Sequence, residues 1–553
     1  MTSALPKRLI EVDLPIKRIS AHARREKSIR HGHISTLHIW WARRPLAACR
    51  AVVCASLWPD PADPNCPDSF RKSAREWMAK WSKDHLKLLD RESYERFVSF
   101  RDDPAKLHDN ELLRQSLFDF IAAFSDWENS TVSEFLNTSR ALTQSAHEAL
   151  GGARDTKPLV VDPFAGGGSI PLEALRVGAD VYASDLNPVP VLLNKVILEY
   201  VPKYGQRLAD HVRKWGEWIR QEAEGQLAKF YPTDSDGATP IAYLWARTIR
   251  CEGPGCGAEV PLTRSLWLSK KTNRSVALQI VPDSKSKRVE FRVIVKQNGG
   301  WVDQNDPTIR IDHPTFGGTV RRSSATCPCC GYTTSAERVR RQFQGRAGGA
   351  DDARLLCVVS LSPSRAGRTF RLPSSQDYAA SKSAKAEMDR LISSDNCSPS
   401  IVPAEELPYL RSIFNVQLLG VTSWGQLFSS RQLLALTTLV RLLRSVGEQL
   451  AAQNDPEFSS AIQTVLAFMI DKQADLGNSL CPWEPIAECP RHLFGRQAIG
   501  IVWDFAEGVV TSDSSGGWAV QVDRTVKLLE GIGSDWGIGN SQQASATSHS
   551  SAR

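Results

Sequence analysis

The 553-residue chain lacks long hydrophobic runs, since no stretch of about 18 uncharged apolar residues occurs in it. Its N-terminus also lacks the apolar core of a secretory signal peptide, and instead carries Lys7, Arg8, Glu11 and Asp13. These absences argue against a membrane-spanning helix and a secretory leader. We therefore expect a cytoplasmic protein with no membrane partner.

The chain has little excess charge of either sign, because a net charge of +7 is small for this length. The distribution is more informative, since residues 17–50 contain nine basic residues and one acid, Glu26. The basic residues are Lys17, Arg18, Arg24, Arg25, Lys27, Arg30, Arg43, Arg44 and Arg50. Such a segment is typical of a phosphate-binding track or of a solvated helix face, and charge alone does not separate the two.

An apolar content of 42% with 23% charged residues is that of a folded protein, and the length predicts two to four domains. Changes in composition and periodicity predict seven regions. These are an N-terminal region at 1–60, a helical insert at 61–155, a strand-loop-helix-strand unit at 156–205, a helix with a cysteine-bearing insert at 206–345, variable loops at 346–403, a helical region at 404–530 and a disordered tail at 531–553.

A glycine-rich loop stands at the centre of the strand-loop-helix-strand unit. The short apolar strand Pro158-Leu-Val-Val-Asp162 leads into Pro163-Phe-Ala-Gly-Gly-Gly168, after which Ser169-Ile-Pro-Leu-Glu173 begins a helix. Ser169 suits the N-cap of that helix, and Pro171 suits its first turn. Three glycines let the backbone approach a ligand closely, and the free N–H groups of the helix start favour a carboxylate.

The second strand of this unit, residues 180–184, ends at Asp185, where an acidic side chain can bind the two hydroxyls of an unphosphorylated ribose. A P-loop is excluded because no Gly-Lys-Ser/Thr follows the glycines. A dinucleotide fingerprint is excluded because Pro171 occupies the position of its third glycine. S-adenosylmethionine (AdoMet) remains, and an ordinary glycine turn explains neither Phe164 nor the spacing to Asp185.

Four of the twelve cysteines lie in two turn-like pairs, Cys251-Glu-Gly-Pro-Gly-Cys256 and Cys327-Pro-Cys-Cys330. We expect reduced thiols in the cytoplasm, and this spacing is typical of a zinc ribbon. Cys329 makes the register of the second pair ambiguous, but Gly331 favours the use of Cys327 and Cys330. Four thiolates leave no open coordination position, so the zinc would be structural. The alternative is four buried free thiols.

The N-terminal segment Leu37-His-Ile-Trp-Trp-Ala-Arg-Arg-Pro45 places two indoles beside two guanidinium groups. Trp40, Trp41, Arg43 and Arg44 can together stack a purine or hold a phosphate. Taken alone, such a segment is more often core packing beside a surface arginine pair.

The segment Asp162 to Ser169 resembles motif I of the amino-group DNA methyltransferases, and Asp185-Leu-Asn-Pro188 resembles the acidic motif that follows it. With the cysteines and the N-terminal segment, the chain resembles the bacterial adenine-specific DNA methylases that contain a zinc ribbon and begin with a DUF1156 region. This resemblance implies an α/β fold with a partial Rossmann-like methyltransferase sheet, helical segments and a zinc-ribbon insert.

The resemblance also implies roles for individual residues. Phe164, Gly166 and Gly168 would line the AdoMet pocket, Asp162 would lie near the methionine amino group, and Asp185 would hold the ribose. Asn187 would contribute to the same pocket. Trp40, Trp41, Arg43 and Arg44 would help to close it.

The chain contains no Pro-Pro dipeptide, whereas the resembled enzymes hold the target base with Asp/Asn/Ser-Pro-Pro followed by an aromatic residue. We therefore expect the N-terminal portion of an adenine-N6 DNA methyltransferase, truncated before this motif or split from a partner chain that carries it. DNA is the expected partner, and the chain alone is expected to be inactive. By analogy, such an enzyme suits restriction-modification.

Two other functions fit the same sequence. One is a non-catalytic DNA-binding or specificity subunit whose glycine loop is a relic. The other is methylation of RNA, since substrate choice would depend largely on the missing motif.

Overall fold

The computed structural model describes residues 5–29, 32–40, 43–272, 274–364, 366–396, 399–452, 455–495, 497–533 and 535–547. The chain divides into two compact units. The first comprises residues 1–212, 455–465 and 524–553, and the second comprises residues 213–454 and 466–523. Among the described residues, no helix is long and apolar enough to span a membrane.

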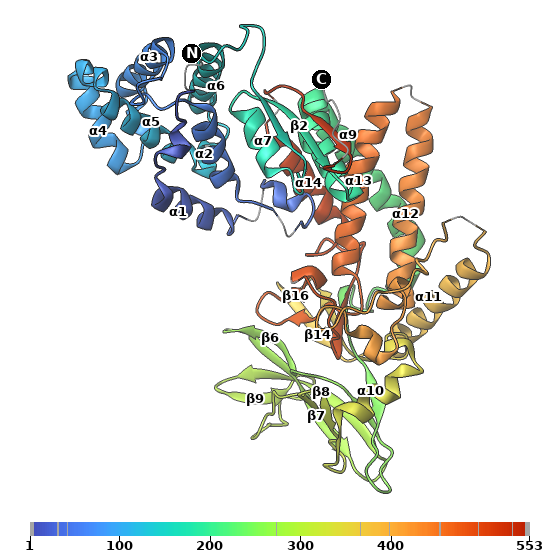
Figure 1. Ribbon diagram of the computed structural model, residues 1–553. Helices are drawn as coiled ribbons and strands as arrows, with labels where there is room; N and C mark the ends of the chain where they lie inside the picture. The colour runs from blue at the N-terminus through green and yellow to red at the C-terminus, as the bar shows by residue number, and fades with distance from the viewer. Residues whose placement is uncertain are drawn as a thin grey trace. The chain divides into compact units, whose positions relative to one another are not determined.

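Six helices, coloured blue to teal in Figure 1, form the N-terminal part of the first unit. They are α1 (Ile16–Glu26), α2 (Leu46–Leu57), α3 (Asp68–Asp84), α4 (Arg91–Asp102), α5 (Asn110–Phe124) and α6 (Ser133–Ala149). Buried aromatic side chains hold them together: Trp81 packs on Phe120 and Phe135, and its indole N–H donates to Thr138 Oγ1 at 2.8 Å. The apolar helix α2 lies between its N-cap Pro45 and its C-cap Trp58.

The first unit also contains a three-stranded parallel sheet in the order β1-β2-β18. Its strands are β1 (Leu159–Asp162), β2 (Asp180–Asp185) and β18 (Asn540–Gln543), with α7 (Ser169–Arg176) connecting β1 to β2 and α8 (Pro188–Asn194) following β2. Leu159 pairs with Asp180, and Gln543 pairs with Asp185. The βαβ unit expected around the glycine loop is therefore present.

The first strand of this parallel sheet is an edge strand with an exposed face. Among the described residues, β1 pairs only with β2. The side chains of Leu159 and Val161 are 55% and 52% exposed. Parallel strands are normally buried on both faces, so an apolar strand that is this exposed is unusual.

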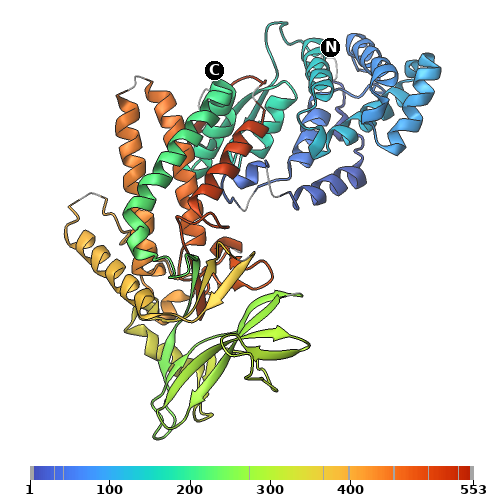
Figure 2. The ribbon, with the colours of Figure 1, turned by 180° about the vertical axis from the view of Figure 1, so that it is seen from behind.

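The second unit is built on two four-stranded antiparallel sheets, ordered β14-β13-β3-β17 and β6-β7-β8-β9. The first has β3 (Thr239–Ala246), β13 (Arg354–Leu361), β14 (Arg368–Arg371) and β17 (Asp504–Gly508). The second, yellow-green in Figures 1 and 2, has β6 (Trp267–Lys271), β7 (Arg274–Asp283), β8 (Arg288–Gln297) and β9 (Gly300–Asp303). A shared hydrophobic core includes Leu244, Leu268 and Val359.

Short strands and further helices complete the fold. Short strands are β4 (Thr248–Arg250), β5 (Glu259–Pro261), β10 (Val320–Arg321), β11 (Ser324–Thr326), β12 (Thr333–Thr334), β15 (Trp483–Glu484) and β16 (Cys489–Pro490). The remaining helices are α9 (Val201–Leu227), α10 (Ala336–Gln344), α11 (Ser375–Ser393), α12 (Ser430–Ala451), α13 (Pro456–Leu476) and α14 (Trp518–Gly531). Within the region expected to be helical at 404–530, α12 begins with a capping box that pairs Ser429 with Gln432.

The expected structure of three regions needs correction. Residues 346–403, expected to be variable loops, contain β13, β14 and α11, because their apolar strand Arg354–Leu361 is buried and Ser374 with Asp377 caps a helix. The region 404–530 is not wholly helical, since β15, β16 and β17 lie within it. The tail 531–553, expected to be disordered, contains β18, which gains backbone hydrogen bonds from β2.

Candidate functional site

The glycine loop follows β1 and turns sharply into α7. Asp162, at the end of β1, begins the turn by accepting a hydrogen bond from the Phe164 N–H at 3.1 Å. Gly166 and Gly168 have φ angles of 49° and 74°, in the left-handed region that glycine adopts without strain. The Phe164 side chain is 76% exposed. The loop therefore presents an exposed aromatic ring and a backbone free of Cβ atoms at the end of β1.

Asp185 ties the end of β2 to this loop. One carboxylate oxygen accepts from the Gly166 N–H and the other from the Asn187 N–H, both at 3.0 Å. Asn187 is exposed, and its side chain accepts from the Val189 N–H at 3.0 Å, which makes it the N-cap of α8. The structure thus gives Asn187 a capping role, while Asp185 binds the backbone of the glycine loop.

Two carboxylates meet at the ends of adjacent parallel strands. Burial raises the pKa of Asp162, the Phe164 N–H lowers it, and the negative charge of Asp185 raises it again. Among the described residues, no cation forms an ion pair with either carboxylate. The pair therefore suits a ligand that brings a positive charge or several hydroxyl donors.

The N-terminal segment packs directly on the glycine loop. A Cβ atom added to Gly166 would lie 3.0 Å from Trp40 Nε1, and one added to Gly167 would lie 2.9 Å from Arg43 Nε. Both of these nitrogens are buried without a hydrogen-bond acceptor among the described residues. Burial lowers the pKa of Arg43 to about 10. Two unused donors therefore lie at the loop.

The other two residues of this segment have different outcomes. Arg44 is exposed and makes no hydrogen bond or ion pair among the described residues. Trp41 lies outside the described residues.

One side chain at the start of α7 differs from expectation. Ser169 was expected to be the N-cap, but the cap is Gly168, and Ser169 is the first helical residue. Its hydroxyl is buried with no partner among the described residues, so it is a further unused donor at the loop.

Asn194, which the sequence did not single out, donates to the Gly166 carbonyl at 3.0 Å. No local sequence signal marks it, because its role comes from the return of α8 toward the loop.

A buried ion-pair cluster fixes the N-terminal helices to α7. Glu173 on α7 accepts from Arg50 Nε of α2 at 2.6 Å and from Arg176 Nη1 at 2.5 Å. All three side chains are buried. The sequence feature that could have indicated this cluster is Glu173 itself, a charged residue within the apolar pattern that follows the loop. Its effect is to hold the α2 region beside the glycine loop.

Replacing Glu173 with glutamine is expected to destabilise the protein by about 3–5 kcal/mol, because two buried guanidinium groups lose their counter-charge. Urea unfolding followed by tryptophan fluorescence measures this change. Glu76, exposed on α3, provides the matched control, and Glu76→Gln should leave the midpoint unchanged. Equal midpoints for Glu173→Gln and the unmodified protein would contradict the stabilising role.

The phosphate track considered for residues 17–50 is only partly available. Arg18 pairs with Asp119 at 2.7 Å, Arg25 pairs with Asp126, and Arg50 is buried against Glu173. Exposed cations remain on and beside α1, namely Lys17, Arg24 and Lys27. The local charge excess therefore serves packing between helices as well as the surface.

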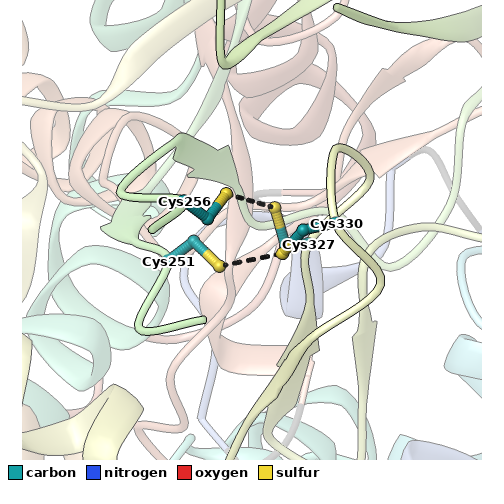
Figure 3. Close-up of side chains that lie close together, drawn as sticks. All are labelled: Cys251, Cys256, Cys327 and Cys330. Atoms are coloured by element: carbon teal, nitrogen blue, oxygen red, sulfur yellow. Dashed lines mark hydrogen bonds between the residues drawn. The ribbon is translucent and has the colours of Figure 1, made fainter. Parts of the chain in front are cut away.

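The four predicted cysteine ligands converge at one point (Figure 3). Their Sγ atoms all lie within 4.8 Å of one another. Cys251 and Cys330 are 3.5 Å apart at sulfur, and Cys256 and Cys327 are 3.9 Å apart. Tetrahedral zinc with Zn–S bonds of about 2.3 Å requires S···S distances of roughly 3.8 Å. The four cysteines can therefore bind one metal ion, and their geometry is compatible with zinc.

Backbone turns position these sulfurs. The Gly253 N–H donates to Cys251 Sγ at 3.4 Å, and Gly331 turns the second pair with a φ of 75°. The ambiguity at Cys329 is resolved, because its thiol instead donates to the Arg288 carbonyl at 3.4 Å. The 70 residues between the two pairs build the β6–β9 sheet, which explains their number.

Comparison with known proteins adds one finding. Residues 13–83 match the family model described as "Protein of unknown function (DUF1156)". The match spans α1, α2 and most of α3, and so extends beyond the boundary expected at residue 60. No curated protein and no solved structure matches the chain. The segment that packs on the glycine loop lies within the matched region.

Proposed function

We propose that the glycine loop binds AdoMet and that the chain is the cofactor-binding part of an adenine-N6 DNA methyltransferase. The observation that carries this proposal is the set of polar groups that converge on one loop. Carboxylates stand at the ends of β1 and β2, and buried donors without partners stand opposite them on Trp40, Arg43 and Ser169.

The groups on this loop correspond to the groups that AdoMet carries. Asp162 is an acceptor for the methionine ammonium, and Asp185 is an acceptor for the ribose hydroxyls. Arg43 and the N-terminus of α7 offer positive potential to the methionine carboxylate. Phe164 provides an exposed aromatic face for the adenine ring. The Rossmann-like methyltransferase fold belongs to the same proposal, supported by the parallel β1-α7-β2 unit.

Transfer of the methyl group to a base also needs an acceptor for the amine and an aromatic face for the flipped base. The resembled enzymes provide both with a Pro-Pro motif that this sequence lacks. Among the described residues, one side of the β1 backbone has no partner strand, so this edge is suited to a further parallel strand, and the exposed Leu159 and Val161 mark a sheet face that another element can cover. We propose that a separate chain adds this strand and brings the missing motif beside Asp162.

Isothermal titration of the purified chain with AdoMet tests the proposal. We expect one binding site per chain and no incorporation of labelled methyl groups into duplex DNA by the chain alone. Binding without transfer supports a cofactor-binding part. Absence of AdoMet binding would reject the proposal and favour a non-catalytic DNA-binding subunit, whereas methyl incorporation by the pure chain would reject the need for a partner.

A further inference from the structure

A pocket in the second unit lies between the two four-stranded sheets, away from the glycine loop in the sequence. Its cavity volume is about 60 Å³, and the cavity is partly open to solvent. Its walls are mainly apolar and include Leu244, Leu268 and Leu356 with the indoles of Trp267 and Trp483. Trp483 donates its indole N–H to the Leu268 carbonyl at 2.8 Å, which satisfies its polar group within the protein.

A single carboxylate, that of Asp504, breaks this apolar lining. One of its oxygens accepts from the Arg264 N–H at 3.2 Å. Its own backbone N–H and the positive charges of Arg264 and Arg247 also favour the ionised carboxylate, and no ion pair to Asp504 is present among the described residues. Burial raises the pKa of Asp504, because its charge lies in surroundings that solvate it poorly. A carboxylate oxygen in this position favours a ligand that brings an N–H donor.

Beside the pocket lies a cluster of partly exposed aromatic rings, formed by Trp267, Trp301 and Phe316. Trp267 and Phe316 are stacked with centroids 4.2 Å apart, and Trp301 lies 5.1 Å from Phe316. The Lys270 ammonium lies 5.4 Å from the Trp267 ring centroid. Arg264, which flanks Asp504, is exposed. Partly exposed rings next to cations are typical of surfaces that bind single-stranded nucleic acid.

We propose that this pocket binds one unpaired nucleobase of a nucleic-acid strand, and that Asp504 selects bases with an exocyclic amine. The amine edge of the ring enters the pocket beside the leucines and the indoles, and the exocyclic N–H of adenine or cytosine donates to the Asp504 carboxylate. The neighbouring base stacks on the aromatic cluster, while Lys270 and Arg264 attract the phosphates. This site is independent of the proposed AdoMet site and does not require it to be functional.

Fluorescence anisotropy with labelled 12-nucleotide strands, measured on the full chain without AdoMet, tests this proposal. We expect oligo(dA) and oligo(dC) to bind about tenfold more tightly than oligo(dT), the effect of one charge-assisted hydrogen bond. Asp504→Asn keeps an acceptor for the Arg264 N–H but turns an NH₂ donor toward the base. It is expected to weaken oligo(dA) binding about tenfold and to leave oligo(dT) binding unchanged or tighter.

Matched variants separate this role from a general loss of structure. Asp312→Asn changes an exposed aspartate of the same unit and should alter no affinity. Trp267→Leu should weaken all three strands, whereas Trp218→Leu on α9 should weaken none. Free deoxyadenosine should bind at least about tenfold more weakly than the strand, since it lacks the neighbouring base and the phosphates.

Three outcomes would overturn the proposal. The first is equal affinity for the three strands together with no effect of Asp504→Asn. The second is the absence of strand binding. The third is equal affinity for deoxyadenosine and oligo(dA), which would assign the pocket to a free nucleoside.

Discussion

Cys327→Ser is expected to reduce the zinc content of the purified protein from about one ion per chain to nearly none. Serine replaces a thiolate ligand with a hydroxyl that stays protonated, so the tetrahedral set loses one donor. Cys327 is buried in a core with Ile249, Phe343 and Trp503, and loss of the ion would loosen that core. We expect a loss of about 4 kcal/mol and a melting temperature lower by on the order of 10 °C.

Cys329→Ser is the matched control, because Cys329 lies two positions away but directs its thiol to the Arg288 carbonyl. Elemental analysis by mass spectrometry and differential scanning calorimetry measure both variants. We expect Cys329→Ser to keep its metal and its melting temperature. A metal-free unmodified protein, or equal metal loss in both variants, would contradict the assignment of Cys251, Cys256, Cys327 and Cys330 as the ligands.

The second large effect is expected at Asp185. In the proposed complex, Asp185→Ala removes the acceptor of the ribose hydroxyls and also frees the Gly166 N–H that shapes the loop. Hydrogen bonds to a charged group contribute about 1.5–3 kcal/mol each, so we expect the AdoMet dissociation constant to rise about 100-fold. Isothermal titration calorimetry measures this change.

Asp180 supplies the control for this measurement. It lies at the opposite end of β2, and its side chain is exposed. Asp180→Ala should bind AdoMet as the unmodified chain does, and thermal unfolding of both variants reports whether the fold is retained. If Asp185→Ala bound AdoMet with unchanged affinity, the ribose role of this carboxylate would be wrong.

The sequence predicted those parts of the candidate sites that are encoded locally. The glycines, Asp162 and Asp185 stand at fixed positions relative to two strands, so their convergence follows from the geometry of a βαβ unit. The cysteine pairs likewise lie in turns that their glycines predict. Gly331 favoured Cys330 over Cys329 as the fourth ligand, and Cys330 is the one that lies with the other three cysteines. Local backbone chemistry was sufficient in both cases.

Features that depend on distant pairing could not be predicted. The polar segment Asn540–Gln543 has no strand pattern of its own and becomes β18 only through its hydrogen bonds to β2. The segment 346–403, which was expected to form loops, contains β13, and the place of this strand in the sheet depends on its pairing with β3. The pocket at Asp504 brings together residues from six segments, so no window of sequence contains it.

The attachment of β18 to β2 has a consequence for how the protein is made. Tyr182 and Gln542, which hydrogen-bond across these strands, are 360 positions apart in the chain. At a translation rate of about 5–20 residues per second, roughly 20–70 s separate the synthesis of the two strands. Throughout that interval the nascent β1-β2 pair has no neighbour on either edge, which makes it prone to pairing with other chains. Slower translation or lower chaperone levels should therefore increase aggregation and reduce the yield of native protein.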